Sequence, residues 1–366
     1  MREVIVAGGG PAGLAAAIAA RQAGLEVTVV DRAHPPIDKA CGEGIMPDGL
    51  AALQRLGVTV PPAQAFAFGG IRFVDDSHSV EATFAAGRGY GIRRVILHEL
   101  LVQRAVAVGV DLRWGTRVTG LSPDGVEIEG TLIPYRWLVC ADGQNSLLRK
   151  KSGAFKSRPA SVRYGFRRHY RVALWTNFVE VHWADCGQMY VTPVAEDQLC
   201  VALITGDPEL RFDAAVPRFS KLALRLRDAE VCDRTIGALT ASRKLSNVHS
   251  GRIALIGEAA GSVDAITGEG LSIAFRQAAV LAAAMRNDSL VHYQEAHDRI
   301  MRVPRNMARL LLSMDQRPGL RGRVLGALER QNEAFRRMLA IHTGASSVRE
   351  FGLGQVLLLG WNLINV

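Results

Sequence analysis

Residues 4–13 read VIVAGGGPAG, and this stretch decides the fold of the 366-residue chain. The apolar run at 4–7 predicts a strand buried in a parallel sheet, and the small apolar residues at 14–23 predict a helix directly after the glycines. A second apolar run at 27–30 ends on Asp31. Strand, helix and strand within about 30 residues indicate a βαβ unit.

The glycines of this unit have the spacing of a dinucleotide-binding turn. Gly8, Gly10 and Gly13 permit a tight turn, a close approach of the backbone to a pyrophosphate, and close packing of the helix on the strand. Asp31, at the end of the second strand, is placed to accept hydrogen bonds from a ribose. Because a helix N-terminus offers free N–H groups and a positive dipole end, we predict a bound dinucleotide rather than a bare glycine turn. The motif alone does not distinguish FAD from NAD.

Composition excludes several classes of protein. The length allows two domains of roughly 150 residues each, and 48% hydrophobic with 22% charged residues is typical of a soluble globular protein. The sequence has no run of about 18 apolar residues, so it predicts no membrane-spanning helix. The first residues have no secretory pattern. The five cysteines are odd in number and have no paired spacing, so we expect neither a disulfide framework nor a metal site.

The net charge of +9 comes mostly from arginines that are spread along the chain. Without a basic arm or interleaved aromatic residues, this distribution argues against specific binding of nucleic acid. An excess of arginine suits anionic small molecules or a lipid surface, or it reflects composition alone.

The pattern changes after Gly153, from short apolar strands to longer strands rich in β-branched and aromatic residues. These strands predict a largely antiparallel sheet, before the first pattern returns near Gly251. Helices dominate from about Ser289 to the end. The expected strands are 71–84 (as a strand or hairpin), 110–114, 117–121 and 126–129 (as a meander), 137–141, 162–172, 177–183, 188–194, 198–204 and 252–256. The expected helices are the end of 41–56, and 94–108, 218–229, 271–285, 306–314 and 322–341.

Further motifs follow the glycine turn along the chain. They are Arg94-x-x-Leu97, Ala141-Asp142-Gly143-x-Asn145-Ser146-x-x-Arg149, Gly257-Glu258-Ala259-Ala260-Gly261 and Asp264-x-x-Thr267-Gly268-Glu269-Gly270. Together with the glycine turn, this series resembles the FAD-dependent monooxygenases built on the p-hydroxybenzoate hydroxylase plan. Its last motif is similar to the geranylgeranyl reductase-like branch of that family. The resemblance covers residues 1–290, and no motif covers the C-terminal helices.

The resemblance implies an α/β fold. Its parts would be a Rossmann-like FAD-binding domain of the glutathione-reductase type, an inserted antiparallel-sheet substrate domain, and a C-terminal helical segment. We expect the FAD-binding domain in residues 1–70, 88–155 and 250–300, the substrate domain in 71–87 and 156–249, and C-terminal helices in 301–366.

The resemblance also implies which residues hold FAD. Asp31 would bind the adenosine ribose with Arg32 beside the adenine, and the backbone of Val118 would pair with the adenine. Arg94 would reach the ribityl or pyrophosphate region, unless it only caps a surface helix, and Asp142 would lie on the pyrophosphate side, unless it only forms a turn. The expected cofactor-binding residues are Gly8, Gly10, Pro11, Ala12, Gly13, Asp31, Arg32, Lys39, Ala40, Cys41, Gly42, Arg94, Val118, Asp142, Gly143, Gly257, Glu258, Gly268, Glu269, Gly270 and Leu271.

Two positions in this set carry specific expectations. Glu258 stands where the family usually has aspartate, so we expect a slight shift of the loop or a contact to FAD through water. The helix that begins near Leu271 would direct its N-terminus at the N1 and C2 carbonyl edge of the flavin. The positive end of its dipole would then stabilise an anionic reduced flavin.

The segment Lys39-Ala40-Cys41-Gly42 is similar to the loop of the prenyl-reductase branch that approaches the flavin ring. Cys41 is therefore a candidate catalytic residue, as a proton donor to a reduced alkene, or else a small group packed by the ring. Glu43 is a candidate general base, or else a carboxylate that binds backbone N–H groups.

Polar residues of the expected substrate domain are harder to interpret. Tyr164, Arg167, His169, His182 and Tyr190 alternate along strands, and a single histidine on a strand is more often structural than catalytic. Residues 186–193 stand where flavin halogenases have a Trp-x-Trp-x-Ile-Pro signature, of which only the proline is present, so halogenation is disfavoured.

From the resemblance we expect an NAD(P)H-dependent monooxygenase that hydroxylates an apolar phenolic or polyketide-like molecule through a flavin C4a-hydroperoxide. NAD(P)H would dock transiently, since no second dinucleotide turn is present. The alternative is a flavin-dependent reductase of isoprenoid-type C=C bonds. A third possibility is a non-enzymatic protein that binds lipidated partners, as GDP-dissociation inhibitors of related fold do.

The expected location is cytoplasmic, with a possible peripheral contact of the C-terminal helices with a membrane. Residues 310–312 and the apolar tail 352–366 suggest that contact, although packing over the substrate domain explains them equally well. The expected partner is a small apolar substrate, with no nucleic acid, and the chain is a monomer or a homodimer.

Overall fold

The glycine turn connects the first strand and helix of a six-stranded, mostly parallel sheet. The computed structural model describes residues 2–347, without the side chains of residues 2 and 157–160. Strand β1 (Arg2–Ala7) lies between β12 (Tyr135–Cys140) and β2 (Val27–Asp31) and is parallel to both. The full order is β19 (His249–Ser250), β20 (Ile253–Leu255), β12, β1, β2 and β8 (Asp111–Trp114), with only β19 antiparallel to its neighbour.

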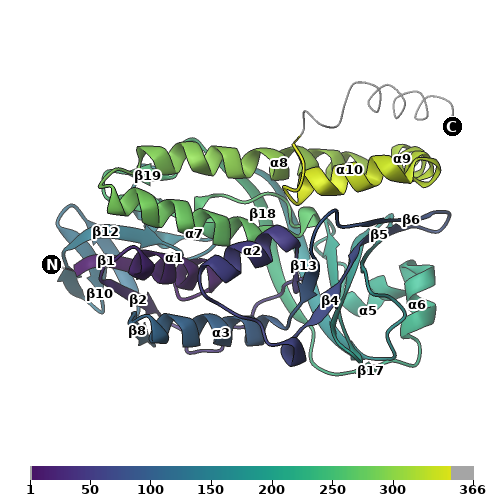
Figure 1. The fold of residues 1–366 in the computed structure, drawn as a ribbon, viewed down its shortest axis with the longest axis horizontal. Helices are drawn as coiled ribbons and strands as arrows, with labels where there is room; N and C mark the ends of the chain where they lie inside the picture. Colours follow the sequence, from purple (N-terminus) through teal and green to yellow (C-terminus); the bar gives the residue numbers. More distant parts are fainter. Residues whose placement is uncertain (1, 348–366) are drawn as a thin grey trace.

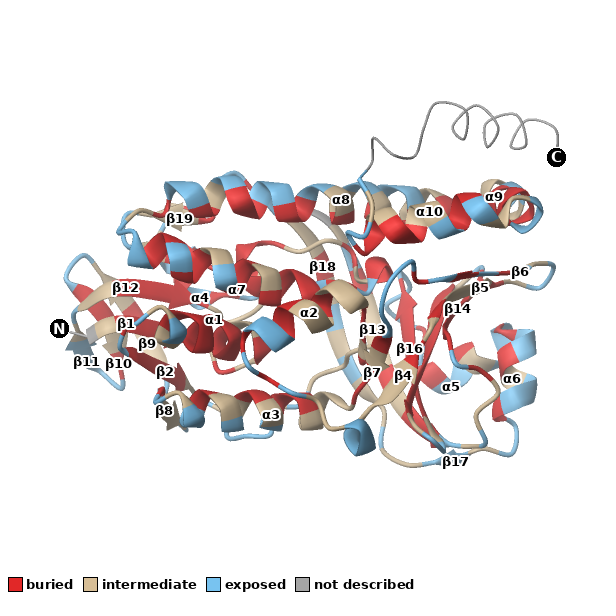
Figure 2. Ribbon diagram, viewed as in Figure 1, coloured by how far each residue is buried: buried red, intermediate tan, exposed pale blue. Residues whose placement is uncertain are grey.

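Helices pack together against this sheet because its central strands are largely apolar. Helix α1 (Pro11–Gln22) is buried along almost its whole length, and its many alanines allow close packing against α7 (Gly270–Arg286) and α3 (Arg94–Ala107). Figure 2 shows α1 as an almost continuously buried helix beside the sheet. The elements predicted here from sequence are confirmed, within a few residues at their ends.

A separate three-stranded sheet corrects the expected meander at 110–129. Its strands are β9 (Val118–Ser122), β10 (Gly125–Ile128) and β11 (Thr131–Ile133), all antiparallel. The expected first strand is instead β8, which pairs in parallel with β2 at the edge of the large sheet. Gly115, with φ of +69°, turns the chain between β8 and β9. Strand periodicity predicts each strand but not its partner, so this pairing was wrong.

The second large sheet is a mostly antiparallel sheet of eight strands. The four strands expected after Gly153 are all present, and the pattern at 71–84 is a hairpin. A long strand that the sequence interpretation missed, β18 (Ile236–Leu245), pairs with β13 over most of its length. The order is β17 (Glu230–Val231), β13 (Ser157–Arg171), β16 (Gln198–Thr205), β15 (Gly187–Ala195), β14 (Val179–Ala184), β5 (Gly70–Val74) and β6 (Ser79–Thr83). Strand β18 pairs with the same edge of β13 as β17, opposite β16.

Short elements connect the two sheets. Helix α2 occupies Pro47–Arg55, which confirms that the segment 41–56 is helical at its end. The helix expected at 218–229 is shorter than predicted and forms α6. These elements are β3 (Gly44–Ile45), α2 (Pro47–Arg55), η1 (Pro62–Gln64), β4 (Phe66–Phe68), β7 (Gly89–Gly91), α4 (Leu147–Lys151), α5 (Phe212–Ala215), η2 (Val216–Arg218), α6 (Ser220–Leu226), η3 (Gly257–Ala260) and η4 (Ala265–Thr267).

Three C-terminal helices lie along one side of the molecule, across both large sheets (Figure 1). Helix α8 (Val291–Gln316) packs on α7, whereas α9 (Pro318–Arg330) and α10 (Asn332–His342) pack on β6. The expected helix at 306–314 is only the end of α8, and the one at 322–341 is divided at Gln331. The apolar tail 352–366 lies outside the described residues. No helix within residues 2–347 is both long and apolar enough to span a membrane.

Candidate active site

A single cavity of about 1090 Å³ extends from the glycine turn to the C-terminal helices. All of the expected cofactor-binding residues line it except Gly13. The glycine turn and the 257–270 loop, far apart in sequence, therefore face the same space. Glu43 lines this cavity as well.

The glycine turn has the geometry that a bound pyrophosphate needs. A Cβ on Gly8 would lie 2.4 Å from the Ala141 carbonyl oxygen, and a Cβ on Gly13 would lie 1.8 Å from the Gly8 carbonyl oxygen. Gly13 is therefore needed for packing rather than for contact. Gly10, the N-cap of α1, faces open space, and no side chain caps the helix. The N-terminal N–H groups of α1 are thus available to an anionic group.

Asp31 is fixed at the end of β2 by backbone donors. One carboxylate oxygen accepts from the Gly9 N–H at 2.6 Å and the other from the Ala33 N–H at 2.8 Å. Both oxygens keep further lone pairs, so the side chain can also accept from ribose hydroxyls. This arrangement fits the adenosine half of a dinucleotide.

Arg149 links the motif at residues 141–149 to the motif at residues 257–261. Its guanidinium donates to the carbonyl oxygens of Ala259 at 2.9 Å and Gln144 at 2.6 Å. Asp142 accepts at Oδ2 from the Leu147 N–H at 2.8 Å, while its buried Oδ1 has no partner among the described residues. A buried carboxylate oxygen without a donor fits a site where a hydroxyl-bearing ligand binds.

Glu258 pairs with Lys39 across the cavity, at 2.7 Å between Oε2 and Nζ. Both side chains are about 40% exposed, so screening keeps the contribution of this pair small. The extra methylene relative to aspartate lets the carboxylate reach the loop that carries Cys41. A contact from Glu258 to FAD, direct or through water, stays a prediction.

The loop before α7 contains a buried carboxyl group, Glu269. Both of its oxygens lack hydrogen-bond partners among the described residues, and the Nδ1 atom of His342 lies 3.6 Å from one of them. Burial, together with the Asp48 carboxyl, raises the pKa of Glu269 well above its usual range. A neutral Glu269 leaves the positive end of the α7 dipole unopposed at the cavity. Gly268 and Gly270 on either side face open space, which fits a planar ring against this loop.

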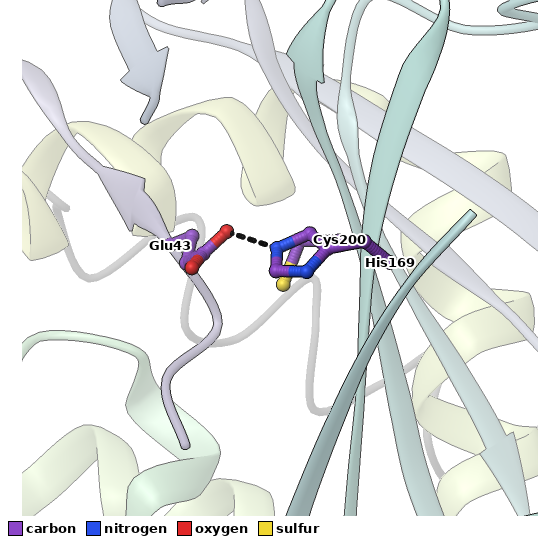
Figure 3. A group of neighbouring side chains, drawn as sticks. All are labelled: Glu43, His169 and Cys200. Atoms are coloured by element: carbon purple, nitrogen blue, oxygen red, sulfur yellow. Dashed lines mark hydrogen bonds and ion pairs between the residues drawn. The ribbon is translucent and has the colours of Figure 1, made fainter. Parts of the chain in front are cut away.

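A buried ionic cluster, which we name the Glu43 cluster, joins the Cys41 loop to the second sheet. It consists of Asp38, Glu43, Arg167, His169 and Asp233. Glu43 Oε2 lies 2.7 Å from His169 Nε2, and His169 Nδ1 lies 2.6 Å from Asp233 Oδ2. Glu43 Oε1 accepts from the backbone N–H of Arg94 at 2.8 Å and from Arg167 at 3.2 Å. Figure 3 shows Glu43 and His169 directed at each other from the loop and the strand.

Glu43, His169 and Cys200 bring three possible metal-ligand atoms within 4.8 Å of one another. However, Arg167 Nη1 lies 3.2 Å from Glu43 Oε1 and 3.3 Å from both ring nitrogens of His169. A fixed guanidinium charge at this distance opposes a divalent cation. Burial also raises the pKa of the Cys200 thiol well above its usual range, which disfavours the thiolate that metals bind. The group is therefore better described as an ionic cluster.

Beyond the Cys41 loop, the cavity widens into what we call the apolar chamber. Its floor is formed by β5, β14, β15 and β16, and its roof by α8, α9 and α10. The Tyr190 hydroxyl donates to the Ile266 carbonyl oxygen at 2.5 Å, which ties this floor to the loop before α7. The chamber is lined mainly by Phe68, Ile71, Phe73, Val179, Val181, Tyr190, Ala202, Ile204, Met307, Leu310, Leu311, Met314, Val324, Leu328, Phe335, Met338 and Leu339.

Sequence reasoning brought together the cofactor-binding residues but missed most of the rest. Of the polar residues singled out on strands, His169 and Arg167 belong to the Glu43 cluster, Tyr190 lines the chamber, and His182 pairs with Glu180 at 2.9 Å away from the cavity. Asp233 gave no signal, because no motif covers it, and in the roof only residues 310–312 were singled out, as a membrane contact or as packing over the substrate domain. Only the amphipathic pattern of the C-terminal helices indicated a buried face.

The chain matches the model of the FAD binding domain family over residues 1–186. It is 28% identical to a menaquinone reductase of Mycolicibacterium smegmatis over 346 residues, which cover 84% of each chain. It is 26% identical to the candidate FAD-dependent monooxygenase YetM of Bacillus subtilis, over 78% of this chain and 85% of that one. The crystal structure of a flavoprotein/dehydrogenase from Cytophaga hutchinsonii superposes with a TM-score of 0.85 at 18% identity, covering 99% of this chain and 98% of that one.

These similarities agree with the geometry of the cavity, where the glycine turn, Asp31, Asp142 and the 257–270 loop fit FAD. The chain belongs to the FAD binding domain family, among the FAD-dependent monooxygenases and their geranylgeranyl reductase-like relatives, and it is an FAD-dependent oxidoreductase.

Proposed function

We propose that the chain reduces a C=C bond in an apolar, isoprenoid-like substrate. The observation that carries this proposal is the position of Cys41, in the cavity wall between the cofactor-binding residues and the apolar chamber. The similarity to a menaquinone reductase over most of both chains supports a reductase rather than an oxygenase. This order reverses the sequence-based preference for hydroxylation.

The chamber suits a long apolar chain better than a small polar ring. Its walls are mostly Phe, Met, Leu, Ile and Val side chains. A hydrocarbon chain that binds against them removes apolar surface from water, which favours binding. Burial raises the pKa of Tyr190, the phenol in its wall, so this group stays neutral. Most of the ionised groups at the cavity belong to its cofactor half and to the Glu43 cluster.

In this proposal each part of the chain has one task. The N-terminus of α1 and Asp31 hold the dinucleotide, and the roof helices exclude water from the substrate. When bound, FAD supplies the hydride, for which we propose NAD(P)H as the source. Cys41 supplies the proton to the second carbon from Sγ. The Sγ atom is held by the backbone N–H of Glu43 at 3.4 Å, so the thiol has a defined position.

Hydroxylation of an apolar phenolic or polyketide-like molecule is the second candidate. The similarity to YetM over most of the chain favours it. The same closed, apolar chamber would protect oxygen chemistry from water. This candidate gives Cys41 no proton-transfer role, so Cys41→Ser would leave hydroxylation nearly unchanged.

One experiment separates the two candidates. The purified holoprotein is supplied with NADH or NADPH and a menaquinone with a short isoprenoid side chain, first without oxygen and then under ¹⁸O₂. We expect saturation of one double bond without oxygen, detected as a gain of two hydrogens that remains after the product is reoxidised to the quinone, since a quinol alone would lose them. Cys41→Ser should slow this step by at least about tenfold, since a thiol is a better acid than a hydroxyl. A product that contains ¹⁸O and forms only with oxygen would refute the reductase proposal.

A further inference from the structure

Reduction of a C=C bond needs a proton as well as a hydride. The walls of the apolar chamber are mainly hydrocarbon, and the hydroxyl of Tyr190 in them donates its hydrogen to the Ile266 carbonyl oxygen. A thiol that gives its proton to carbon must recover one before the next turnover. This inference therefore rests on the proposed function. The Glu43 cluster connects the loop that carries Cys41 with solvent, through groups that exchange protons.

The contacts of this connection are short from Asp233 to Glu43. Asp233 is 26% exposed and lies 2.6 Å from His169 Nδ1. The imidazole is fully buried, and its Nε2 lies 2.7 Å from Glu43 Oε2. Glu43 lines the cavity and is two residues from Cys41, whose Sγ accepts the Glu43 N–H. Short contacts thus lead from solvent to the Glu43 carboxyl, and the Cys41 thiol lies two residues away in the same loop, facing the same cavity.

The hydrogen-bond pattern leaves one proton to be shared. A neutral imidazole has a single N–H, yet both ring nitrogens of His169 face a carboxylate oxygen. Two hydrogen bonds therefore require a second proton, on the ring or on one of the two carboxyl groups. A proton arriving at one end can then leave at the other, because imidazole passes protons between its two nitrogens.

The charges around His169 are nearly balanced. Glu43 and Asp233 attract a proton to the ring, whereas the guanidinium of Arg167 lies 3.3 Å from both ring nitrogens and repels it. Asp38 at 2.7 Å from Arg167 and Arg93 at 3.3 Å from Asp233 complete the charged neighbours, and the uncharged Cys200 thiol lies beside Glu43. Side chains of both charges therefore surround the imidazole.

We propose that Asp233, His169 and Glu43 form a proton relay that returns a proton from solvent to the Cys41 thiol. The S–H bond of Cys41 breaks as a C–H bond forms on the substrate. The Glu43 carboxyl then gives its proton to the thiolate and takes one from His169 Nε2. Asp233 passes a proton from water to Nδ1, so one proton crosses from solvent to carbon and no electrons move along the path.

A buried pair elsewhere in the same sheet provides a matched control. His182 lies 2.9 Å from Glu180, and both are buried, as in the relay. Although burial opposes it, hydrogen bonds from His182, Trp175 and Arg72 lower the pKa of Glu180 to about 2. His182 does not line the cavity, so the pair has no connection to Cys41.

The test compares the holoproteins His169→Asn, Asp233→Asn and His182→Asn with the wild type. The first readout is the rate of Cys41 alkylation by iodoacetamide across pH, measured by mass spectrometry of the Cys41 peptide, which needs no substrate. The second is the anaerobic rate of menaquinone saturation in H₂O and in D₂O, beside the rate of flavin reduction by NAD(P)H. Asp233→Asn keeps the test decisive if His169→Asn fails to fold, because the Asp233 side chain is partly exposed and its replacement should leave the fold intact.

We expect His169→Asn and Asp233→Asn to shift the pH profile of Cys41 alkylation. Both should slow saturation at least about tenfold with a larger solvent isotope effect, and leave flavin reduction within about twofold of wild type. His182→Asn should change none of these. Alkylation profiles that superpose on wild type would overturn the relay. If the wild type fails to saturate menaquinone, the proposed function fails, and the alkylation profiles still decide the relay.

Discussion

The two halves of the cavity are built from different parts of the chain. The cofactor half consists largely of backbone, with glycines at the turn, free N–H groups at helix starts, and carbonyls held by Arg149. The apolar chamber consists of side chains from five strands, Phe68 of β4 included, and three helices. Backbone geometry requires particular residues at particular positions, whereas an apolar wall accepts many combinations. The cofactor half should therefore tolerate few substitutions, whereas the chamber should tolerate many.

Gly13→Ala is the strongest test of this contrast. The added Cβ would lie 1.8 Å from the Gly8 carbonyl oxygen, so α1 must move away from the turn. We expect loss of nearly all bound FAD and a loss of at least about 3 kcal/mol in the free energy of unfolding. The flavin absorbance of the purified protein and its denaturant unfolding measure the two effects.

Two further glycine variants serve as controls for Gly13→Ala. Gly10→Ala puts its Cβ into the open cavity, so FAD affinity should fall while the fold remains stable. Gly319→Ala lies in α9 with no neighbouring atom within 4 Å and should stabilise that helix by about 0.5–1 kcal/mol. A Gly13→Ala protein that is as yellow and as stable as Gly319→Ala would contradict the contrast.

The junction between the two halves should respond to acid. Burial lowers the pKa of His342 in the roof to about 4, from an ordinary value of 6.5. As pH falls from 6.5 to about 4, the unfolded chain binds a proton that the folded chain refuses, so stability decreases. The full difference corresponds to about 3 kcal/mol, and below pH 4 this contribution ends.

His342→Gln should flatten that pH dependence. Unfolding midpoints in urea at pH 7, 6, 5 and 4 would show a smaller decrease for the variant than for the wild type. Glu269, whose pKa is raised, has the opposite sign: its contribution is present at low pH and is lost as pH rises. Parallel decreases for the two proteins would mean that His342 titrates normally in the fold.

Ala202→Phe should have the smallest effect of the three, and it acts only on the chamber. Ala202 lies in β16 and lines the cavity, so a phenyl ring there would occupy substrate space. We expect substrate turnover to fall about tenfold, with unchanged flavin absorbance and a stability cost of about 1–3 kcal/mol. Equal losses of FAD and turnover would show that the halves are not separable.

The same contrast explains how much of the molecule could be predicted from sequence. The glycine spacing, Asp31 and the later motifs predicted a common cofactor site because each needs a specific residue type for a backbone reason. The strands of the second sheet were predicted from periodicity, but β18 was missed because its burial alternates irregularly. The partner of β8 was wrong because alternation does not encode which edge a strand joins.

The Glu43 cluster could not be predicted because its members lie far apart in the chain. Glu43, His169 and Asp233 come from a loop, a strand and the segment after β17, and none belongs to a motif that specifies the others. Glu43 was singled out by its neighbouring glycines, and one of its expected roles, the binding of a backbone N–H, is seen. Its carboxylate accepts a backbone N–H from Arg94, and its general-base role stays a prediction.

The path of the chain between the two large sheets has a consequence for protein engineering. The chain leaves the parallel sheet after β2 and after β12, and it returns each time, the last time to add β20 beside β12. The parallel sheet is therefore complete only after the ribosome has synthesised residue 255, the end of β20. Transplanting the chamber onto another flavin enzyme would require exchanging 66–91, 157–245 and the terminal helices together, because no single cut releases it.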